Sequence, residues 1–126
     1  MAQGVLTGKY LPGKKPPTGS RATDKKSGAG MISRWLREDV LTAVQKLGPI
    51  AKEAELTIGQ LSIAWVLQNP NVSSAIMGAT KPSQVKENVK ASGVKLSADQ
   101  MKTIDKALGS IPTTDPKETQ SPNPRA

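Results

Sequence analysis

The sequence predicts an α/β protein that is mostly helical, with about four helices and one or two short strands. Apolar residues recur every three or four positions in several stretches, two capping boxes mark helix starts, and a short apolar run enters a helix through a glycine. One or two strands cannot make a sheet with both faces covered. Taken by itself, the sequence therefore resembles part of a larger α/β domain.

The first third of the chain predicts a strand end followed by a long loop. Residues 1–10 are expected to leave a strand and turn, and residues 11–33 hold three prolines and four glycines. Loops of this length in compact domains are usually functional or disordered. Residues 1–37 also carry a charge of +7, out of +8 for the whole chain. Such a basic region attracts polyanions, from nucleic acid to a phosphorylated cofactor.

Helices are predicted through the middle and at the end of the chain. One runs from about Ile32 or Trp35 to residue 54, with an apolar face made of Leu36, Val40, Val44, Leu47, Ala51 and Ala54. Thr57–Gln60 is a capping box that opens a second helix, which stops at Asn69 before a proline. Ser97–Gln100 is another capping box, and the helix that follows it is expected to close at Gly109.

The segment 74–88 is the most informative part of the sequence. Ala75–Met77 is predicted to be a short buried strand, followed by a turn at Gly78 and a helix that opens within Thr80–Pro82. The first N–H groups of a helix and the positive end of its dipole favour an anion there. Lys81 adds a full positive charge. Adjacent turns of the same helix would carry Gln84, Glu87 and Asn88.

Composition excludes several classes of site. The chain has no cysteine and no histidine, so disulfides, thiolate metal sites and Ser–His or Cys–His relays are ruled out, and no metal site is expected. No apolar run approaches the roughly 20 residues of a membrane span, and the N-terminus lacks the pattern of a signal peptide. We therefore expect a cytoplasmic protein without membrane contact. Residues 110–126 hold four prolines and are expected to be an extended or disordered tail.

Three segments, in order, resemble the C-terminal segment of an aldo-keto reductase. They are Ala2–Tyr10 with the loop ending at Arg21, Leu56–Leu67, and Val72–Asn88. The branch that they resemble includes the potassium-channel beta subunits and related bacterial reductases. The resemblance implies that residues 1–109 are the C-terminal part of a (β/α)8 TIM barrel. Residues 2–6 would end strand 7, residues 11–33 would form the cofactor loop, and residues 75–77 would be strand 8.

The same resemblance implies an NADP(H) site. The pyrophosphate side would be lined by Ala2, Gln3, Lys9 and Arg21. The adenosine and its 2′-phosphate would be held by Gly78, Thr80, Gln84, Glu87 and Asn88, with Lys81 adding charge. The complete enzyme would reduce aldehydes or ketones by hydride transfer. The family's catalytic Asp, Tyr, Lys and His precede the matched region, and Tyr10 does not correspond to that tyrosine. We therefore expect no catalytic residue here, and no activity of this chain alone.

Other interpretations of the same residues remain open. Lys9 and Arg21 are also compatible with solvated loop cations, and the polar residues of 84–88 with an ordinary helix surface. The chain could instead be a binding or assembly module that pairs with itself or with another barrel segment. Nucleic-acid binding is suggested only by the charge, because the loop at residues 11–33, called the basic loop below, has no interleaved aromatic residues and no recognised binding motif.

Overall fold

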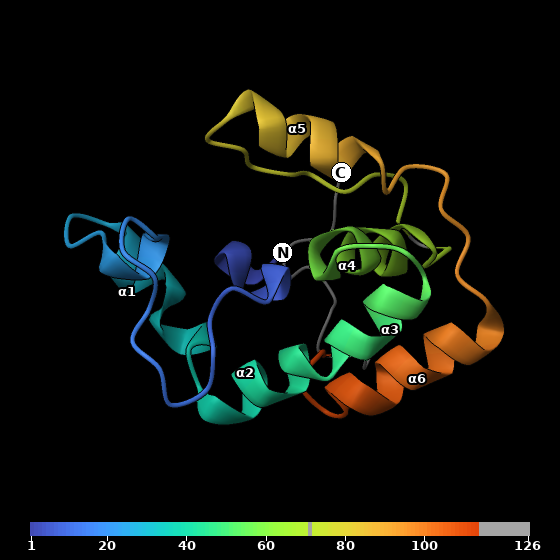
Figure 1. Cartoon of the computed structure of the whole chain (residues 1–126), viewed down its shortest axis with the longest axis horizontal. Coiled ribbons are helices and arrows are strands. Elements are labelled where there is room, and N and C mark those ends of the chain that lie inside the picture. Colours follow the sequence, from blue (N-terminus) through green and yellow to red (C-terminus); the bar gives the residue numbers. More distant parts are fainter. Residues whose placement is uncertain (71, 114–126) are drawn as a thin grey trace, which may run out of the picture.

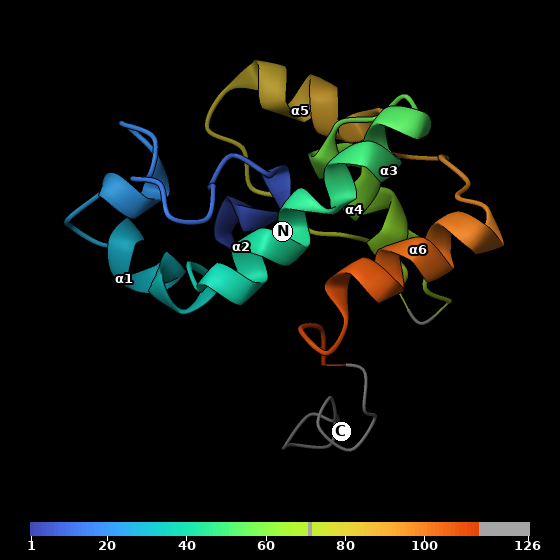
Figure 2. The same ribbon diagram turned by 60° about the horizontal axis from the view of Figure 1, so that its bottom comes forward.

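The computed structural model describes residues 1–70 and 72–113, which form a mostly helical body (Figures 1 and 2). The α-helices of this described part are α1 Gly28–Ile32, α2 Glu38–Gln45, α3 Leu47–Glu53, α4 Ile58–Leu67, α5 Pro82–Val89 and α6 Ala98–Leu108. Short 3₁₀ helices cover Ala2–Thr7, Arg21–Thr23 and Ser33–Trp35. The prediction of a mostly helical chain is confirmed.

Both predicted capping boxes form. Thr57 Oγ1 accepts the N–H of Gln60 at 3.1 Å, and Gln60 Oε1 accepts the N–H of Thr57 at 2.9 Å. Ser97 and Gln100 make the same exchange at 3.1 and 2.9 Å at the start of α6. Each box satisfies two N–H groups that have no partner inside the helix. Gly109 ends α6 with a φ of 55°, as expected of a glycine at a helix end.

The long helix predicted up to residue 54 is divided. A 3₁₀ turn at Ser33–Trp35 comes first, α2 begins at Glu38, and α2 passes into α3 at Lys46. Pro49 explains the second division, because proline has no N–H for the carbonyl of Gln45 and its ring crowds that oxygen. As a result, the apolar face of this stretch serves two clusters instead of one continuous stripe.

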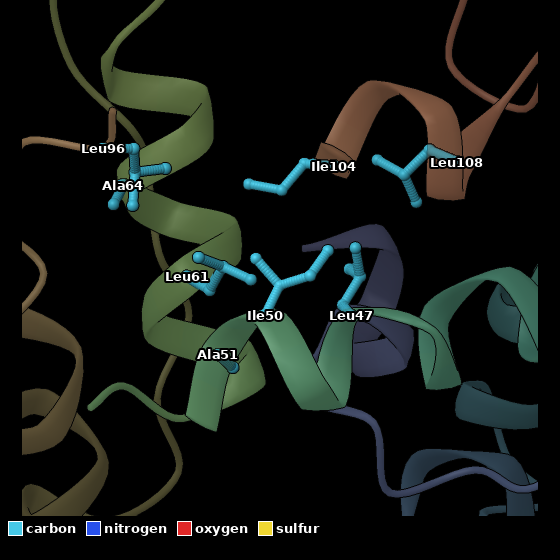
Figure 3. Packing of buried hydrophobic residues seen from close by; sticks show 8 residues of the cluster. All are labelled: Leu47, Ile50, Ala51, Leu61, Ala64, Leu96, Ile104 and Leu108. Carbon is cyan, nitrogen blue, oxygen red and sulfur yellow. The ribbon is translucent and has the colours of Figure 1, made fainter. Parts of the chain in front are cut away.

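The main hydrophobic core lies between α3, α4 and α6. Figure 3 shows Ile50 pointing from α3 into the space between Leu61 of α4 and Ile104 of α6. Leu61 is 0% exposed and Ile104 is 1% exposed. The other buried members of this cluster are Leu47, Ala51, Ala64, Leu96 and Leu108. Removal of this apolar surface from water is the main stabilising contribution to the body.

A second cluster joins the N-terminal segment to α2. Its buried members are Val5, Tyr10, Ile32, Val40, Leu41 and Val44. Gln45 of α2 adds a polar connection, because its Nε2 donates to the backbone oxygens of Gly8 at 3.0 Å and of Tyr10 at 3.2 Å. These contacts fix the beginning of the basic loop to the helical body.

The two short strands predicted from the sequence are not formed in the described part of the chain. Residues 2–6 lie in a 3₁₀ helix, and residues 75–77 are irregular and not buried as expected, since Ile76 is 99% exposed. A strand needs a neighbouring strand to pair with. Among the described residues, 73–79 make no backbone–backbone hydrogen bond. The strands expected at residues 2–6 and 75–77 are therefore corrected to a 3₁₀ helix and an irregular segment.

The remaining segments differ in part from the prediction. The stretch 11–33, expected to be one long loop, contains the 3₁₀ turn Arg21–Thr23 and the short helix α1. Residues 114–126, which make up most of the predicted tail, lie outside the described residues. Residues 110–113 follow α6 as turns and bends, and the N–H of Ile111 donates to the carbonyl of Leu108 at 3.2 Å.

Candidate functional site

The start of α5 brings several predicted cofactor residues together. Lys81 is the extended residue before the helix, and Pro82 takes the first helical position, where a missing N–H costs nothing. Gln84 folds back so that its Oε1 accepts the N–H of Thr80 at 2.7 Å and the N–H of Lys81 at 3.3 Å. The Thr80 hydroxyl donates to the same oxygen at 3.2 Å. A neutral oxygen thus occupies N–H donors of the kind that bind anions at helix starts.

A surface hollow of about 540 Å³ lies beside this turn. It is lined by Ala79, Thr80, Lys81, Pro82, Val85 and Lys86. Two lysine side chains and the positive end of the helix dipole favour negative charge at this place. Pro82 and Val85 add apolar surface to this shallow, open hollow. The hollow therefore suits a ligand that combines an anionic group with an apolar ring.

Glu87 and Asn88 lie further along α5, as predicted, but Glu87 already has partners. Its Oε1 pairs with Lys90 Nζ at 2.8 Å. Gln60 Nε2 donates to the Glu87 backbone oxygen at 2.9 Å and to its Oε2 at 3.3 Å. Asn88 is half-buried, and its carbonyl accepts the N–H of Ala91 at 3.1 Å. The charge of Glu87 is therefore partly neutralised within the chain.

Ala2 and Gln3 have an unusual backbone. Their φ angles are 43° and 58°, and Gly4 follows at 95°. The left-handed conformation costs a residue with a side chain about 1–2 kcal/mol, so this segment stores strain. Observed strain of this kind is a reason to suspect a binding site. Both residues are half-buried at the N-terminal end of the chain.

Lys9 and Arg21 are both exposed on the basic region. The Nζ of Lys9 lies 5.2 Å from the centroid of the Tyr10 ring, in a cation–π contact. Arg21 begins a 3₁₀ turn whose backbone is approached closely by Gly28. A Cβ atom at Gly28 would lie 2.5 Å from the carbonyl oxygen of Arg21, so only glycine fits this crossing.

Asp24 organises the loop around Arg21. Its carboxylate accepts the N–H of Lys26 at 3.0 Å, the N–H of Gly28 at 3.1 Å and the hydroxyl of Ser27 at 3.4 Å. The N–H of Lys26, followed by that of Gly28, holds the pKa of Asp24 below its usual value. The carboxylate therefore stays ionised and fixes the loop by charge-assisted hydrogen bonds.

The predicted site residues form two groups. Thr80, Lys81 and Gln84 contact one another, and Gly78 is exposed just before them. The other group lies in the N-terminal third of the chain and consists of Ala2, Gln3, Lys9 and Arg21. Figures 1 and 2 place the turn before α5 on the side of the molecule that carries the basic loop. Across residues 1–70 and 72–113, however, no hydrogen bond or ion pair joins the two groups.

Sequence reasoning missed three residues of this region. Lys86 lines the hollow, Asp24 shapes the loop, and Gln60 bonds to α5. Gln60 was recognised only as part of a capping box, because its second partner lies 27 residues further along the chain. Asp24 could have been found from its short polar side chain two residues before a possible N–H partner, which is the pattern of an Asx turn.

The described part of the chain offers little else that resembles a site. A second hollow, of about 350 Å³, is lined by Tyr10, Leu11, Gly13, Lys14, Pro16, Leu36, Glu38 and Leu41, and contains none of the predicted site residues. No group of three acidic side chains in residues 1–70 and 72–113 is arranged to hold a metal ion. None of the helices described is both long enough and apolar enough to cross a membrane.

Comparison with known proteins supports the resemblance seen in the sequence. The model of the aldo/keto reductase family matches residues 1–108. The chain is 48% identical over 91 residues to a probable voltage-gated potassium channel subunit beta of Arabidopsis thaliana, which covers 72% of this chain and 27% of the relative. The corresponding protein of Oryza sativa is 40% identical over 121 residues, which covers 96% of this chain and 36% of the relative.

A bacterial reductase is also similar to the chain. The L-glyceraldehyde 3-phosphate reductase of Escherichia coli is 30% identical over 109 residues, or 86% of this chain and 31% of the reductase. The chain therefore spans about a third of the length of these curated relatives.

Proposed function

The chain belongs to the aldo/keto reductase family, and on this premise we propose that it carries the adenosine and 2′-phosphate side of an NADP(H) site. The observation that carries the proposal is the hollow beside α5, which Lys81 and Lys86 line next to the start of the helix. A 2′-phosphate would take the anionic position, and the adenine ring would lie on the apolar lining. The cofactor would supply the hydride, and this chain would bind and orient it.

The complete protein, in this proposal, is an NADPH-dependent oxidoreductase with a (β/α)8 barrel that reduces aldehydes or ketones. Lys9 and Arg21 would face the pyrophosphate from the basic loop, with Ala2 and Gln3 beside it. Gly78, Thr80, Gln84, Glu87 and Asn88 would hold the nucleotide. A cytoplasmic location is part of the same proposal.

This chain alone would bind the cofactor without catalysing the reaction. It contains no histidine, one member of the family's catalytic tetrad. The single tyrosine, Tyr10, is 2% exposed and packs in the cluster against α2. A proton donor must reach the reacting carbonyl, and the hollow that Tyr10 lines contains none of the proposed cofactor residues.

Replacement of Lys81 by alanine tests the proposal. We expect calorimetric titration to show that the unchanged chain binds NADPH more tightly than NADH. Lys81→Ala should weaken NADPH binding about fivefold, because an exposed ion pair contributes about 1 kcal/mol. NADH lacks the 2′-phosphate, so its affinity should hardly change. The effect should shrink at high salt concentration.

Lys102→Ala is the matched control, since it removes the same charge from an exposed position on α6, outside the hollow. It should leave the binding of both cofactors unchanged. An equal loss in the two variants would mean that only the overall charge matters. Absence of NADPH binding by the folded, unchanged chain would contradict the proposed site.

A second candidate function is assembly with a further copy of this chain. Ile76 is 99% exposed, and Val85 and Val89 on the neighbouring helix are 51% and 63% exposed. Exposed apolar side chains favour association with another apolar surface. We expect light scattering to give an average mass that rises above the monomer value as concentration increases. Ile76→Thr, which keeps the branched shape but adds a hydroxyl, should return the chain to the monomer mass.

Met31→Thr is the control for that experiment, because Met31 is 51% exposed but lies on α1, outside the segment that holds Ile76, Val85 and Val89. It should not change the mass. A monomer at all concentrations, or an equal response of both variants, would argue against a defined assembly surface.

A further inference from the structure

Helix α5 is poorly anchored by apolar contacts. None of its residues is buried, whereas α3, α4 and α6 each bury at least two side chains in the main core. A helix without a buried face gains little from the hydrophobic effect, so other contacts must hold it in place. This matters for the site, because the hollow and the turn before it move with α5.

Gln60 of α4 supplies such a contact. It is only 6% exposed, and its carboxamide is bonded at both ends. Oε1 accepts the N–H of Thr57 at 2.9 Å, while Nε2 donates to the Glu87 carbonyl at 2.9 Å and to Glu87 Oε2 at 3.3 Å. One buried side chain therefore caps α4 and binds the last turn of α5. A buried polar group that loses such a partner costs the full desolvation free energy of that group. Loss of the Gln60 donor would therefore weaken the attachment of α5 to α4.

A second glutamine of α4 anchors the chain beyond α5. Gln68 Nε2 donates to the carbonyl of Leu96 at 2.7 Å, and Gln68 Oε1 accepts the N–H of the same residue at 2.8 Å. Ala91, between the two anchored points, is 1% exposed. The segment from α5 to α6 is thus attached to α4 at defined positions. Of the two glutamines, Gln60 is the one that contacts α5 itself.

We propose that Gln60 is a positioning residue for the nucleotide site: by binding Glu87, it fixes α5 on α4 and so sets the direction in which the turn at Thr80 and Lys81 faces. At 1.5 Å per residue, α5 is only about 12 Å long, so a constraint on its last turn limits how far its first turn can move. The role in cofactor binding rests on the proposed function. The role in holding α5 does not.

Gln60→Glu separates the two roles of the side chain. A glutamate can still accept the N–H of Thr57, so the cap on α4 is kept. It cannot donate to the Glu87 carbonyl, and it places a second carboxylate beside that of Glu87. Thr57→Val is the matched control, because it removes the hydroxyl that caps Gln60 N–H but leaves the contact with α5 intact.

Hydrogen exchange of the full chain reads the position of α5 directly. In Gln60→Glu we expect the amides of 85–91 to exchange about tenfold faster, while the amides of α3 and α6 keep their protection. In Thr57→Val the amides of α5 should be unaffected. The double variant Gln60→Glu with Glu87→Gln restores a side-chain donor between the two positions, and should recover part of the lost protection.

Should Gln60→Glu not fold, Gln60→Met takes its place, since methionine fills a similar volume without charge. Unchanged exchange in α5, or a loss of protection equal in α3, α5 and α6, would overturn the proposal. In the second case Gln60 would support the whole fold and not α5 in particular.

Titration with NADPH and NADH gives the second measurement. Gln60→Glu should reduce the preference for NADPH over NADH, while Thr57→Val should keep it. If the unchanged chain binds neither nucleotide but α5 loosens as expected, the proposed function fails and the anchoring of α5 by Gln60 stands. If α5 loosens but the preference for NADPH is unchanged, Gln60 does not position the nucleotide site.

Discussion

Leu61→Ala should destabilise the chain by about 3 kcal/mol, the largest effect that we expect of a single substitution. Leu61 is 0% exposed and lies in the cluster that joins α3, α4 and α6 (Figure 3). The shorter side chain loses its contacts with Ile50 and leaves a cavity that the surrounding helices fill only in part. Since small domains are stable by only about 5–15 kcal/mol, this loss is a large fraction of the total.

Urea denaturation followed by circular dichroism measures the effect. With typical slopes of about 1–3 kcal/mol per molar, the midpoint should fall by about 1–3 M. Leu11→Ala is the matched control, because the same atoms are removed from a side chain that is 47% exposed. It should cost less than about 1 kcal/mol. Equal losses in both variants would mean that the cluster around Leu61 is not the stabilising core.

Gln84→Glu should weaken NADPH binding about tenfold and at the same time slow the hydrogen exchange of the α5 amides. The oxygen of Gln84 already accepts the N–H groups of Thr80 and Lys81. A carboxylate in this place would form stronger, charge-assisted hydrogen bonds and interact favourably with the helix dipole. It would also occupy the donors that a phosphate needs, and repel it. Nucleotide affinity and helix stability should therefore change in opposite directions.

Gln100→Glu is the control, since Gln100 holds the same position in the capping box of α6, away from the hollow. It should stabilise α6 and leave nucleotide binding unchanged. The two measurements are calorimetric titration and hydrogen exchange. If Gln84→Glu binds NADPH as tightly as the unchanged chain, the phosphate does not use the start of α5.

The helices could be predicted from the sequence because the interactions that start and end them are local. The capping pairs Thr57 with Gln60 and Ser97 with Gln100 span three residues, and both form as expected. Gly109 closes α6 for the same kind of reason. Pro49 interrupts the hydrogen bonds of the long predicted helix and is a sequence signal for its division. The apolar pattern continues across this point, however, and so indicated a single helix.

The candidate site was predictable only in part. The helix start with Thr80, Lys81 and Gln84 lies within five residues, and the structure brings these side chains together. Lys86 was overlooked because a lysine on an exposed helix carries no signal until the hollow beside it is known. The second group, around Lys9 and Arg21, depends on how the basic loop folds back, which no local pattern specifies.

The sequence by itself determined the family and the starts of α4 and α6, since each depends on short runs of neighbouring residues. Only the tertiary structure decided the rest. Residues 75–77 have strand-like composition, but a strand also needs a partner, and the described residues provide none. Gln60 binds Glu87 across 27 positions of sequence. Contacts between distant residues depend on how the helices pack, and that packing is a property of the folded chain as a whole.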